Sequence, residues 1–345
     1  MQKNIYENDR IKLIENLPLE LPLCVSIEPA NICNFRCTFC FHGNNEQDER
    51  AKPLKIMDDV CFQKVLDDLV AWTGGYRKIK LIKLYSLGEP LLNPHIADWV
   101  RAIKEAGVCN AIEITTNASY LSHEMSGALI DAGLDILRVS VYGATEGLFS
   151  RTTGKPASIE QDVVNNVVYL VKLRNSRGIG YPKVYAKMMD TSEEENSCFF
   201  EKWENVADEC GLDELFDLTS GENDIFQNMY GEGAEMAFEK SMASNLYQNR
   251  KICRYPFTHL TVRSDGIVVV CCADWLKETA YGNVMEHSLK DIWESKSLYE
   301  FRKEMVEQFG ACHKCCQRCE IPLRDTPEDD LTGLTIGRFD YSAEI

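Results

Sequence analysis

The sequence predicts an α/β protein with a parallel sheet, followed by a smaller α+β domain. In the first 220 residues, six β-rich runs alternate with amphipathic stretches, and from about residue 221 a hairpin and a helix replace this alternation. The predicted strands read as apolar on both faces, which is typical of parallel strands covered by helices. Such a sheet is open or curled into a full or partial barrel, and either form gathers functional loops at the carboxyl ends of its strands.

Hydrophobic periodicity and terminating residues locate the elements of the first part. Ser122 can cap one helix, and Gly107 and Gly133 can end two of them. Strands are expected at residues 23–27, 79–85, 111–115, 136–142, 183–189 and 214–219. Helices are expected at residues 58–72, 94–106, 122–133, 159–174 and 193–210.

The second part begins with a stretch rich in Gly, Glu and Asn, residues 221–233, that looks like a linker, and a helical segment follows it to about residue 250. Two β-rich runs, 257–263 and 267–272, are joined by an Asp-Gly pair, which is a hairpin signal. A helix is expected from about residue 288 to 308, before a polar, partly flexible tail. The expected divisions are an N-terminal extension (1–22), the first domain (23–220), a linker and helix (221–250), the second domain (251–320) and a tail (321–345).

Composition narrows the class of protein. The chain has 345 residues, is 45% hydrophobic and carries a formal charge of −17. No apolar run is long enough for a membrane helix, and the first ten residues do not resemble a signal peptide. The acidity argues against nucleic acid as a partner, because affinity for nucleic acid comes largely from neutralising phosphates. We therefore expect a soluble cytoplasmic protein.

The fifteen cysteines are too few for a disulfide scaffold, and their positions suggest another use. Five are scattered singly and read as small buried hydrophobic residues. Three, with the spacing Cys33-x3-Cys37-x2-Cys40, lie on a predicted loop after the first strand. Three thiolates leave one iron of a four-iron cluster open, as a catalytic metal site requires. A zinc site completed by His42, or unliganded thiols, are the alternatives.

This spacing, with the aromatic Phe39 before the third cysteine, resembles the signature of the radical S-adenosylmethionine (radical SAM) superfamily. The run Ser86-Leu-Gly-Glu-Pro90 after the second strand is similar to the family's Gly-Gly-Glu-Pro motif, with Leu87 in place of the first glycine. The resemblance implies a partial (β/α)6 radical SAM barrel that binds S-adenosylmethionine and a 4Fe-4S cluster. It implies that Cys33, Cys37 and Cys40 bind the cluster, and that the contacts to S-adenosylmethionine come from Phe39, Ser86, Gly88, Glu89, Pro90, Asn117 and Ser140.

Seven further cysteines lie between residues 253 and 319. The arrangement Cys253-x12-Gly266-x4-Cys271, followed by Cys312-x2-Cys315, resembles the C-terminal SPASM/twitch domain of the same superfamily. It implies at least one auxiliary 4Fe-4S cluster held by Cys253, Cys271, Cys312 and Cys315. A second cluster, replacement of a ligand by Cys316 or Cys319, and a zinc ribbon remain open. If unliganded, the thiols that could donate hydrogen to a substrate radical are Cys272, Cys316 and Cys319.

The resemblance implies an enzyme that cleaves S-adenosylmethionine reductively to a 5′-deoxyadenosyl radical and abstracts hydrogen from an unactivated C–H bond. Because only about 22 residues precede the first strand, we expect a sugar or aminocyclitol as substrate, in a dehydrogenation or epimerisation. A peptide maturase is the alternative, and a non-catalytic zinc or electron-transfer protein a distant one. An electron donor of the flavodoxin or ferredoxin type is implied. For Arg151 we expect a surface salt bridge rather than a contact to a carboxylate of the methionine or to the substrate, and for His42 a place on the loop surface.

Overall fold

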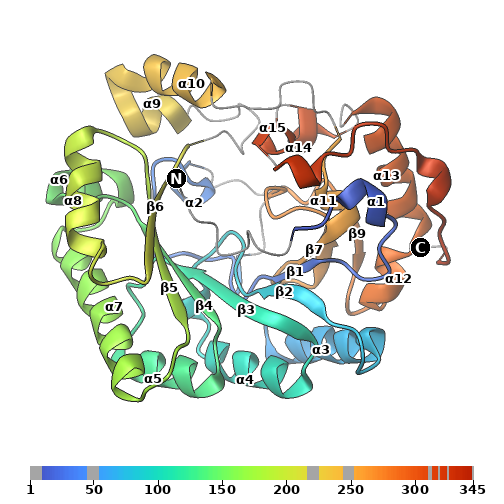
Figure 1. The fold of residues 1–345 in the computed structure, drawn as a ribbon, viewed down its shortest axis with the longest axis horizontal. Helices are drawn as coiled ribbons and strands as arrows, with labels where there is room; N and C mark the ends of the chain where they lie inside the picture. The colour runs from blue at the N-terminus through green and yellow to red at the C-terminus, as the bar shows by residue number, and fades with distance from the viewer. Residues whose placement is uncertain are drawn as a thin grey trace.

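The computed structural model describes residues 10–44, 54–215, 225–243, 252–309, 313–317, 319–324 and 326–343. Within these ranges one nine-stranded sheet runs through the molecule in the order β6-β5-β4-β3-β2-β1-β7-β8-β9 (Figure 1). The strands are β1 (Cys24–Ile27), β2 (Ile79–Lys83), β3 (Cys109–Thr116), β4 (Ile136–Val141), β5 (Lys183–Met189), β6 (Glu209–Asp213), β7 (His259–Val262), β8 (Ile267–Val269) and β9 (Ala280–Asn283). Strands β1 to β7 pair in parallel, and β8 and β9 add antiparallel strands at one edge.

The predicted α/β class is confirmed, and helices such as α3, α4, α5 and α7 cover the outer face of the parallel strands. Those of the first part are α1 (Leu13–Asn16), α2 (Phe41–Asn44), α3 (Asp59–Thr73), α4 (Ile96–Ala106), α5 (His123–Ala132), α6 (Glu146–Thr153), α7 (Ser158–Ser176) and α8 (Glu193–Trp203). Those of the second part are α9 (Ile225–Tyr230), α10 (Ala234–Ala243), α11 (Tyr255–Thr258), α12 (Leu289–Trp293), α13 (Lys296–Gln308), α14 (Lys314–Gln317) and α15 (Ile321–Arg324). Single 3-10 turns are η3 (Pro90–Leu92), η4 (Gly231–Gly233), η5 (Pro327–Asp329) and η6 (Ile336–Arg338).

Local signals set the helix ends. The Ser122 side chain accepts a hydrogen bond from Met125 N at the start of α5, and the Asp58 carboxylate accepts one from Cys61 N at the start of α3. Gly107 and Gly133 adopt left-handed backbone angles directly after α4 and α5, as expected for helix C-caps. These ends agree with the sequence-based expectation for both predicted terminating glycines.

The two faces of the parallel strands differ, which corrects the expectation that both are apolar. On the outer face, Leu137 and Val139 of β4 lie in the hydrophobic core that the helices share. On the inner face, alternate residues such as Arg138 and Ser140 are only partly buried and polar. Because the curved sheet has helices on one side only, its concave side does not need the apolar residues that cover a doubly packed sheet.

The end of the first part also differs from the prediction. Helix α8 ends at Trp203 rather than at residue 210, and the last parallel strand is residues 209–213 rather than 214–219, of which 216–219 lie outside the described residues. The sequence Glu-Cys-Gly-Leu-Asp has little intrinsic preference for a strand. Pairing with β5, in register from Tyr185 to Met189, makes it one.

The second part is less separate than its sequence suggests, because β7 pairs directly with β1 in the middle of the sheet. The predicted linker contains α9 within its described part, and the predicted run 257–263 starts as the short helix α11 before β7. The single helix expected at 288–308 is two, α12 and α13, each capped by a serine. The tail expected to be partly flexible packs onto the core through the buried side chains of Leu331 and Leu334.

Within the described residues, no helix combines the length and apolar character that crossing a membrane requires.

Candidate active site at the carboxyl ends of the strands

The loop after β1 brings together the three cysteines of the first cluster. Cys37 is buried, Cys33 and Cys40 are partly buried, and all three pack with Phe35 and Phe149. Backbone bonds hold the loop against the end of α6: Arg36 N donates to Thr153 O (3.1 Å) and Thr38 N to Thr152 O (2.9 Å). Helix α6 was not predicted, and it provides the wall on which the loop rests.

The three thiols are electrostatic neighbours. Burial raises the pKa of Cys33 to about 12 and holds the pKa of Cys37 well above its usual value. The thiols of Cys33 and Cys37 are therefore protonated in the metal-free chain, and binding a metal centre would release their protons. In the described part of the chain, no three His, Cys, Asp or Glu side chains converge closely enough to hold one metal ion.

His42 lies directly after the cysteines and is 2% exposed, so the expectation that it belongs to the loop surface is wrong. The following residue, Gly43, is enclosed by the same loop. A Cβ at position 43 would lie 2.0 Å from Cys37 O, so only glycine fits there. The backbone at Gly43 therefore packs directly against the backbone of Cys37 in the same loop.

The Ser86–Pro90 segment after β2 packs on the cysteine loop. Glu89 N donates to Ile32 O (2.9 Å), and a Cβ at Gly88 would lie 2.2 Å from Ala30 O. Gly88 is therefore required for the two loops to approach each other. Ser86 Oγ is buried and has no hydrogen-bond partner within the described residues. A buried hydroxyl of this kind is complementary to a polar ligand group.

Glu89 joins this segment to the end of β3. Its carboxylate is 3% exposed and accepts hydrogen bonds from Thr116 Oγ1 (2.5 Å), Asn117 N (2.8 Å) and Leu91 N (3.1 Å). Burial raises the pKa of Glu89 to about 7, although the three donors oppose this shift. The side chain of Glu89 is thus occupied by the protein's own donors and holds the two loops in place.

Asn117 connects β3 with the cysteine loop. Its Nδ2 donates to Asn34 Oδ1 (2.9 Å), and its Oδ1 accepts from Ser119 Oγ (2.6 Å). Asn34 Nδ2 in turn donates to Ser119 Oγ (2.8 Å), which closes a ring of three polar side chains. Asn117 is 2% exposed, so its first role in the structure is to fix the loop.

Phe39 lies on the cysteine loop, and Ser140 lies on β4. The Phe39 ring lies 5.9 Å from the ring of Tyr142, which follows β4. Ser140 is on the inner face of β4, in register with Lys187 of β5. The residues predicted to contact S-adenosylmethionine therefore gather at the carboxyl ends of β1 to β4.

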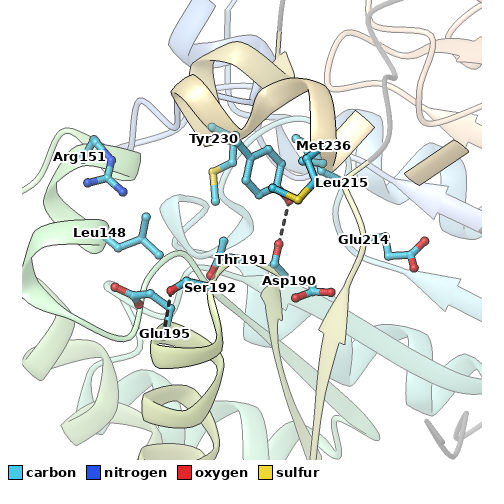
Figure 2. A pocket seen from close by; sticks show the side chains of 13 residues that line it. Leu148, Arg151, Asp190, Thr191, Ser192, Glu195, Glu214, Leu215, Tyr230 and Met236 are labelled. Atoms are coloured by element: carbon cyan, nitrogen blue, oxygen red, sulfur yellow. Dashed lines mark hydrogen bonds between the residues drawn. The ribbon is translucent and has the colours of Figure 1, made fainter. Parts of the chain in front are cut away.

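A pocket of about 420 Å³ lies at the ends of β4, β5 and β6 (Figure 2). Helices α9 and α10 close one side of it, and Tyr230 OH donates to Asp190 O (2.8 Å). Arg151, on α6, lines this pocket and forms no ion pair with the described residues, so the expected salt bridge is absent there. Carboxylates line the pocket too, from Asp190, Glu195 and Glu214.

The second group of cysteines lies near the antiparallel edge of the sheet, where Cys271 and Cys272 follow β8. Cys271 has Cys253, Cys272 and Cys319 as electrostatic neighbours, and shares a side-chain hydrogen bond with Cys272. Cys315 instead lies beside Cys316, with 3.8 Å between their sulfur atoms. Two of the four predicted ligands are thus together, with Cys319 near them.

The remaining predicted ligand of the second group, Cys312, lies outside the described residues. Around Cys315 the environment is acidic, because Cys315 N donates to Glu278 Oε2 (3.0 Å) and Asp274 is an electrostatic neighbour. The ligand set of an auxiliary cluster therefore stays a prediction, and Cys319 joins Cys253 and Cys272 as an electrostatic neighbour of Cys271.

Comparison with known protein families supports the interpretation of both cysteine groups. Residues 27–180 match the radical SAM superfamily, and residues 253–320 match the SPASM iron-sulfur cluster-binding domain. The chain is 26% identical over 343 residues to the tungsten-containing aldehyde ferredoxin oxidoreductase cofactor-modifying protein of Pyrococcus furiosus, covering 89% of this chain and 91% of that protein. It is 30% identical over 164 residues to a probable GTP 3′,8-cyclase of Sulfolobus acidocaldarius, covering 44% of this chain and 47% of the cyclase.

Solved structures share the fold. BtrN in complex with AdoMet and 2-DOIA superposes with a TM-score of 0.53 at 16% identity, covering 87% of this chain and 93% of that chain. Streptococcus suis SuiB bound to the precursor peptide SuiA superposes with a TM-score of 0.58 at 17% identity, covering 90% of this chain and 72% of the SuiB chain. The protein anSMEcpe with bound AdoMet superposes with a TM-score of 0.56 at 15% identity, covering 88% of this chain and 90% of the anSMEcpe chain.

The residues present fit the cofactors of this family. A loop of three neighbouring thiols adjoins a buried serine hydroxyl that has no partner among the described side chains, and a glycine lets the two loops meet. The cofactors of the family are S-adenosylmethionine, a 4Fe-4S cluster and, in the SPASM domain, auxiliary iron–sulfur clusters. The chain belongs to the radical SAM superfamily and carries a C-terminal SPASM domain.

Proposed function

We propose that this protein cleaves S-adenosylmethionine reductively and uses the resulting 5′-deoxyadenosyl radical to abstract hydrogen from a C–H bond of a carbohydrate-like small molecule. The observation that carries this proposal is the contact between the cysteine loop and the Ser86–Pro90 segment, through Glu89 N and Ile32 O. That contact brings the loop of three thiols against the segment that carries the Ser86 hydroxyl, which is buried and has no hydrogen-bond partner among the described residues. The cofactor, when bound, supplies the radical chemistry, and the protein supplies orientation and exclusion of water.

The chain's own residues divide this work. The thiols of Cys33, Cys37 and Cys40 hold the 4Fe-4S cluster. The Ser86–Pro90 segment receives the methionine end of S-adenosylmethionine, with Gly88 giving close approach and Glu89 fixing the loop through Thr116 and Asn117. Ser140 and Phe39 border the adenosyl end. The aromatic rings of Phe35, Phe39, Tyr142 and Phe149 surround this region and exclude water.

In the C-terminal region, we assign the auxiliary cluster to Cys253, Cys271, Cys312 and Cys315. A dehydrogenation requires the substrate radical to lose one electron and one proton, and an auxiliary cluster bound by these cysteines would supply an electron acceptor. An epimerisation requires instead a hydrogen donor on the other face of the substrate. The thiols that we propose for that role are Cys272, Cys316 and Cys319, and Cys272 is the electrostatic neighbour of Cys24 on the inner face of β1.

A small polar substrate is supported by the polar inner face of the sheet and by the 420 Å³ pocket, whose wall combines Arg151 with Tyr230 and three carboxylates. The fold of BtrN, captured with 2-DOIA, is covered almost completely by this chain. A peptide substrate is the second candidate, because SuiB has the same fold and was captured with a precursor peptide. We propose a flavodoxin or ferredoxin as the electron donor.

The test is anaerobic. The purified chain is reconstituted with iron and sulfide, reduced, and incubated with S-adenosylmethionine, and 5′-deoxyadenosine is measured by mass spectrometry. Candidate sugars and peptides deuterated at single carbons are then added, and deuterium in 5′-deoxyadenosine identifies the substrate and the carbon attacked. The proposal fails if no 5′-deoxyadenosine forms, or if zinc in place of iron fills the cysteine sites.

A further inference from the structure

We infer that the inner face of β2, β3 and β4 carries a binding site for an anionic group of the substrate, a carboxylate or a phosphate, centred on the ammonium group of Lys83. The inference rests on the proposed function and extends it by specifying that the substrate carries a negatively charged group.

Register places the residues of this site on one face. Parallel neighbours in register point to the same side of a sheet, and alternate residues along a strand share a face. Lys83 is in register with Glu113, and Thr115 with Arg138. Glu113 and Thr115 are two apart on β3, so all four side chains lie on the face opposite the apolar core beneath the helices. Tyr185, in register with Arg138, continues the row onto β5.

Lys83 has no direct counter-ion. Its ammonium forms no hydrogen bond or ion pair with any described residue, and its one ring contact is with Tyr85, at 5.7 Å. The groups that face it are Tyr85, Cys24, Glu113, Tyr255 and Cys272. Burial raises the pKa of Cys24 to about 11 and that of Tyr85 well above its usual value, so neither carries a negative charge at neutral pH.

Glu113 does not neutralise Lys83 alone, because other residues already use its carboxylate. Tyr85 OH donates to Glu113 Oε1 (2.8 Å), and Arg138 Nη1 lies 3.9 Å from the same oxygen. Glu113 is fully buried, so this arrangement compensates its own charge. Among the described residues of this inner-face row, Lys83 and Arg138 are the cations and Glu113 is the carboxylate, which leaves an excess of one positive charge inside a protein of net charge −17.

The next pair along the inner face leaves that excess unchanged, because Lys187 and Asp213 form an ion pair with each other. The hydroxyl of Thr115, which is in register with Arg138, is a second polar group on this face. Thr115 Oγ1 is buried and has no hydrogen-bond partner among the described residues. An ammonium, a guanidinium and a hydroxyl on one concave face are the donors that bind a carboxylate or phosphate.

The position suits a substrate. Lys83 is the last residue of β2 and precedes Ser86 by three residues, and Arg138 precedes Ser140 by two on β4. The site therefore lies next to the residues assigned to S-adenosylmethionine, on the side toward the amino ends of the strands. On its other side Lys83 is the electrostatic neighbour of Cys272 and Tyr255, next to the second group of cysteines. A molecule anchored here would lie between the two cysteine groups.

The experiment titrates inorganic phosphate and, separately, acetate into the anaerobically reconstituted protein with saturating S-adenosylmethionine, by calorimetry. We expect the wild type to bind at least one of the two anions, and Lys83→Met to bind it at least about tenfold more weakly, a difference of about 1.4 kcal/mol. Lys83→Arg should keep most of the affinity. The matched control is Lys80→Met, on the same strand but the opposite face, which should bind as the wild type does.

Each outcome bears on the inference. Preference for phosphate or for acetate identifies the anionic group. Equal binding by the wild type and Lys83→Met, or no binding of either anion by the wild type, overturns the inference. A parallel titration without S-adenosylmethionine is the last arm, and binding that appears only there also overturns the inference, because the site would then belong to the cofactor. Formation of 5′-deoxyadenosine by the wild type without added anion tests the proposed function separately.

Discussion

Glu28 and Arg263 form an ion pair in the interior of the protein, 235 residues apart in the chain. Arg263 Nε lies 3.1 Å from Glu28 Oε2, and their side chains are 1% and 0% exposed. The same Glu28 oxygen accepts a hydrogen bond from Ser264 N (3.0 Å), and the other accepts one from Leu87 N (3.2 Å). One carboxylate thus joins β1, the Ser86–Pro90 segment and the C-terminal hairpin.

Glu28→Gln should destabilise the protein by about 3–5 kcal/mol, because it leaves the Arg263 charge buried without compensation. It should also weaken the binding of S-adenosylmethionine, since the Leu87 backbone loses a charged acceptor. Urea unfolding and calorimetry with S-adenosylmethionine measure the two effects. Lys290→Met removes an exposed i,i+4 pair with Glu294 and should cost less than about 1 kcal/mol. An equal cost for both variants would contradict this account of Glu28.

Gly88→Ala should prevent the cysteine loop and the Ser86–Pro90 segment from docking. The added methyl group would lie 2.2 Å from Ala30 O and 2.5 Å from Ile32 O, both backbone atoms that cannot move aside without shifting the loop. We expect a loss of about 3 kcal/mol or more and loss of S-adenosylmethionine binding. Gly147→Ala, within α6 and with open space around it, should instead be neutral or stabilise by up to about 1 kcal/mol. Thermal unfolding of the two variants side by side is the measurement, and similar midpoints would refute the steric argument.

Glu89 should make stability fall as pH rises. Its pKa is about 7 in the folded protein, above the value of 4.5 for an unperturbed glutamate, so the folded state holds the proton more tightly. The stabilisation is complete below about pH 4.5 and is lost as pH rises through about 7. We expect the stability of the wild type minus that of Glu89→Gln to decrease between pH 5 and pH 8, by up to about 3 kcal/mol. Urea unfolding midpoints over this range test it, and a constant difference would show that the Glu89 carboxyl ionises at its ordinary pH.

The two cysteine groups should load independently. Cys271→Ser should lower the iron content and leave 5′-deoxyadenosine formation from the first cluster measurable, whereas Cys33→Ser should abolish 5′-deoxyadenosine while iron remains in the C-terminal region. Cys61→Ser, a thiol in the hydrophobic core away from both groups, should change neither. Iron analysis, electron paramagnetic resonance and product assay together decide this. Full iron content in Cys271→Ser would remove this residue from the ligand set.

Local sequence determined much of this protein. The alternation of β-rich runs with amphipathic stretches predicted five of the six strands of the first part, and Ser122, Gly107 and Gly133 marked helix ends. These signals are local, because capping and periodicity depend on neighbours a few residues away. The short spacing of Cys33, Cys37 and Cys40 predicted a metal-binding loop for the same reason.

Tertiary structure decided the rest. Residues 209–213 form a strand only because β5 offers a partner, and β7 joins the sheet only because it pairs with β1. The Glu28–Arg263 pair and the inner-face row around Lys83 depend on which strands become neighbours. Contacts between residues separated by tens or hundreds of positions leave no periodic trace in the chain. The three cysteines could therefore be read from their spacing, whereas the charge of the face on which a substrate would rest required the folded sheet.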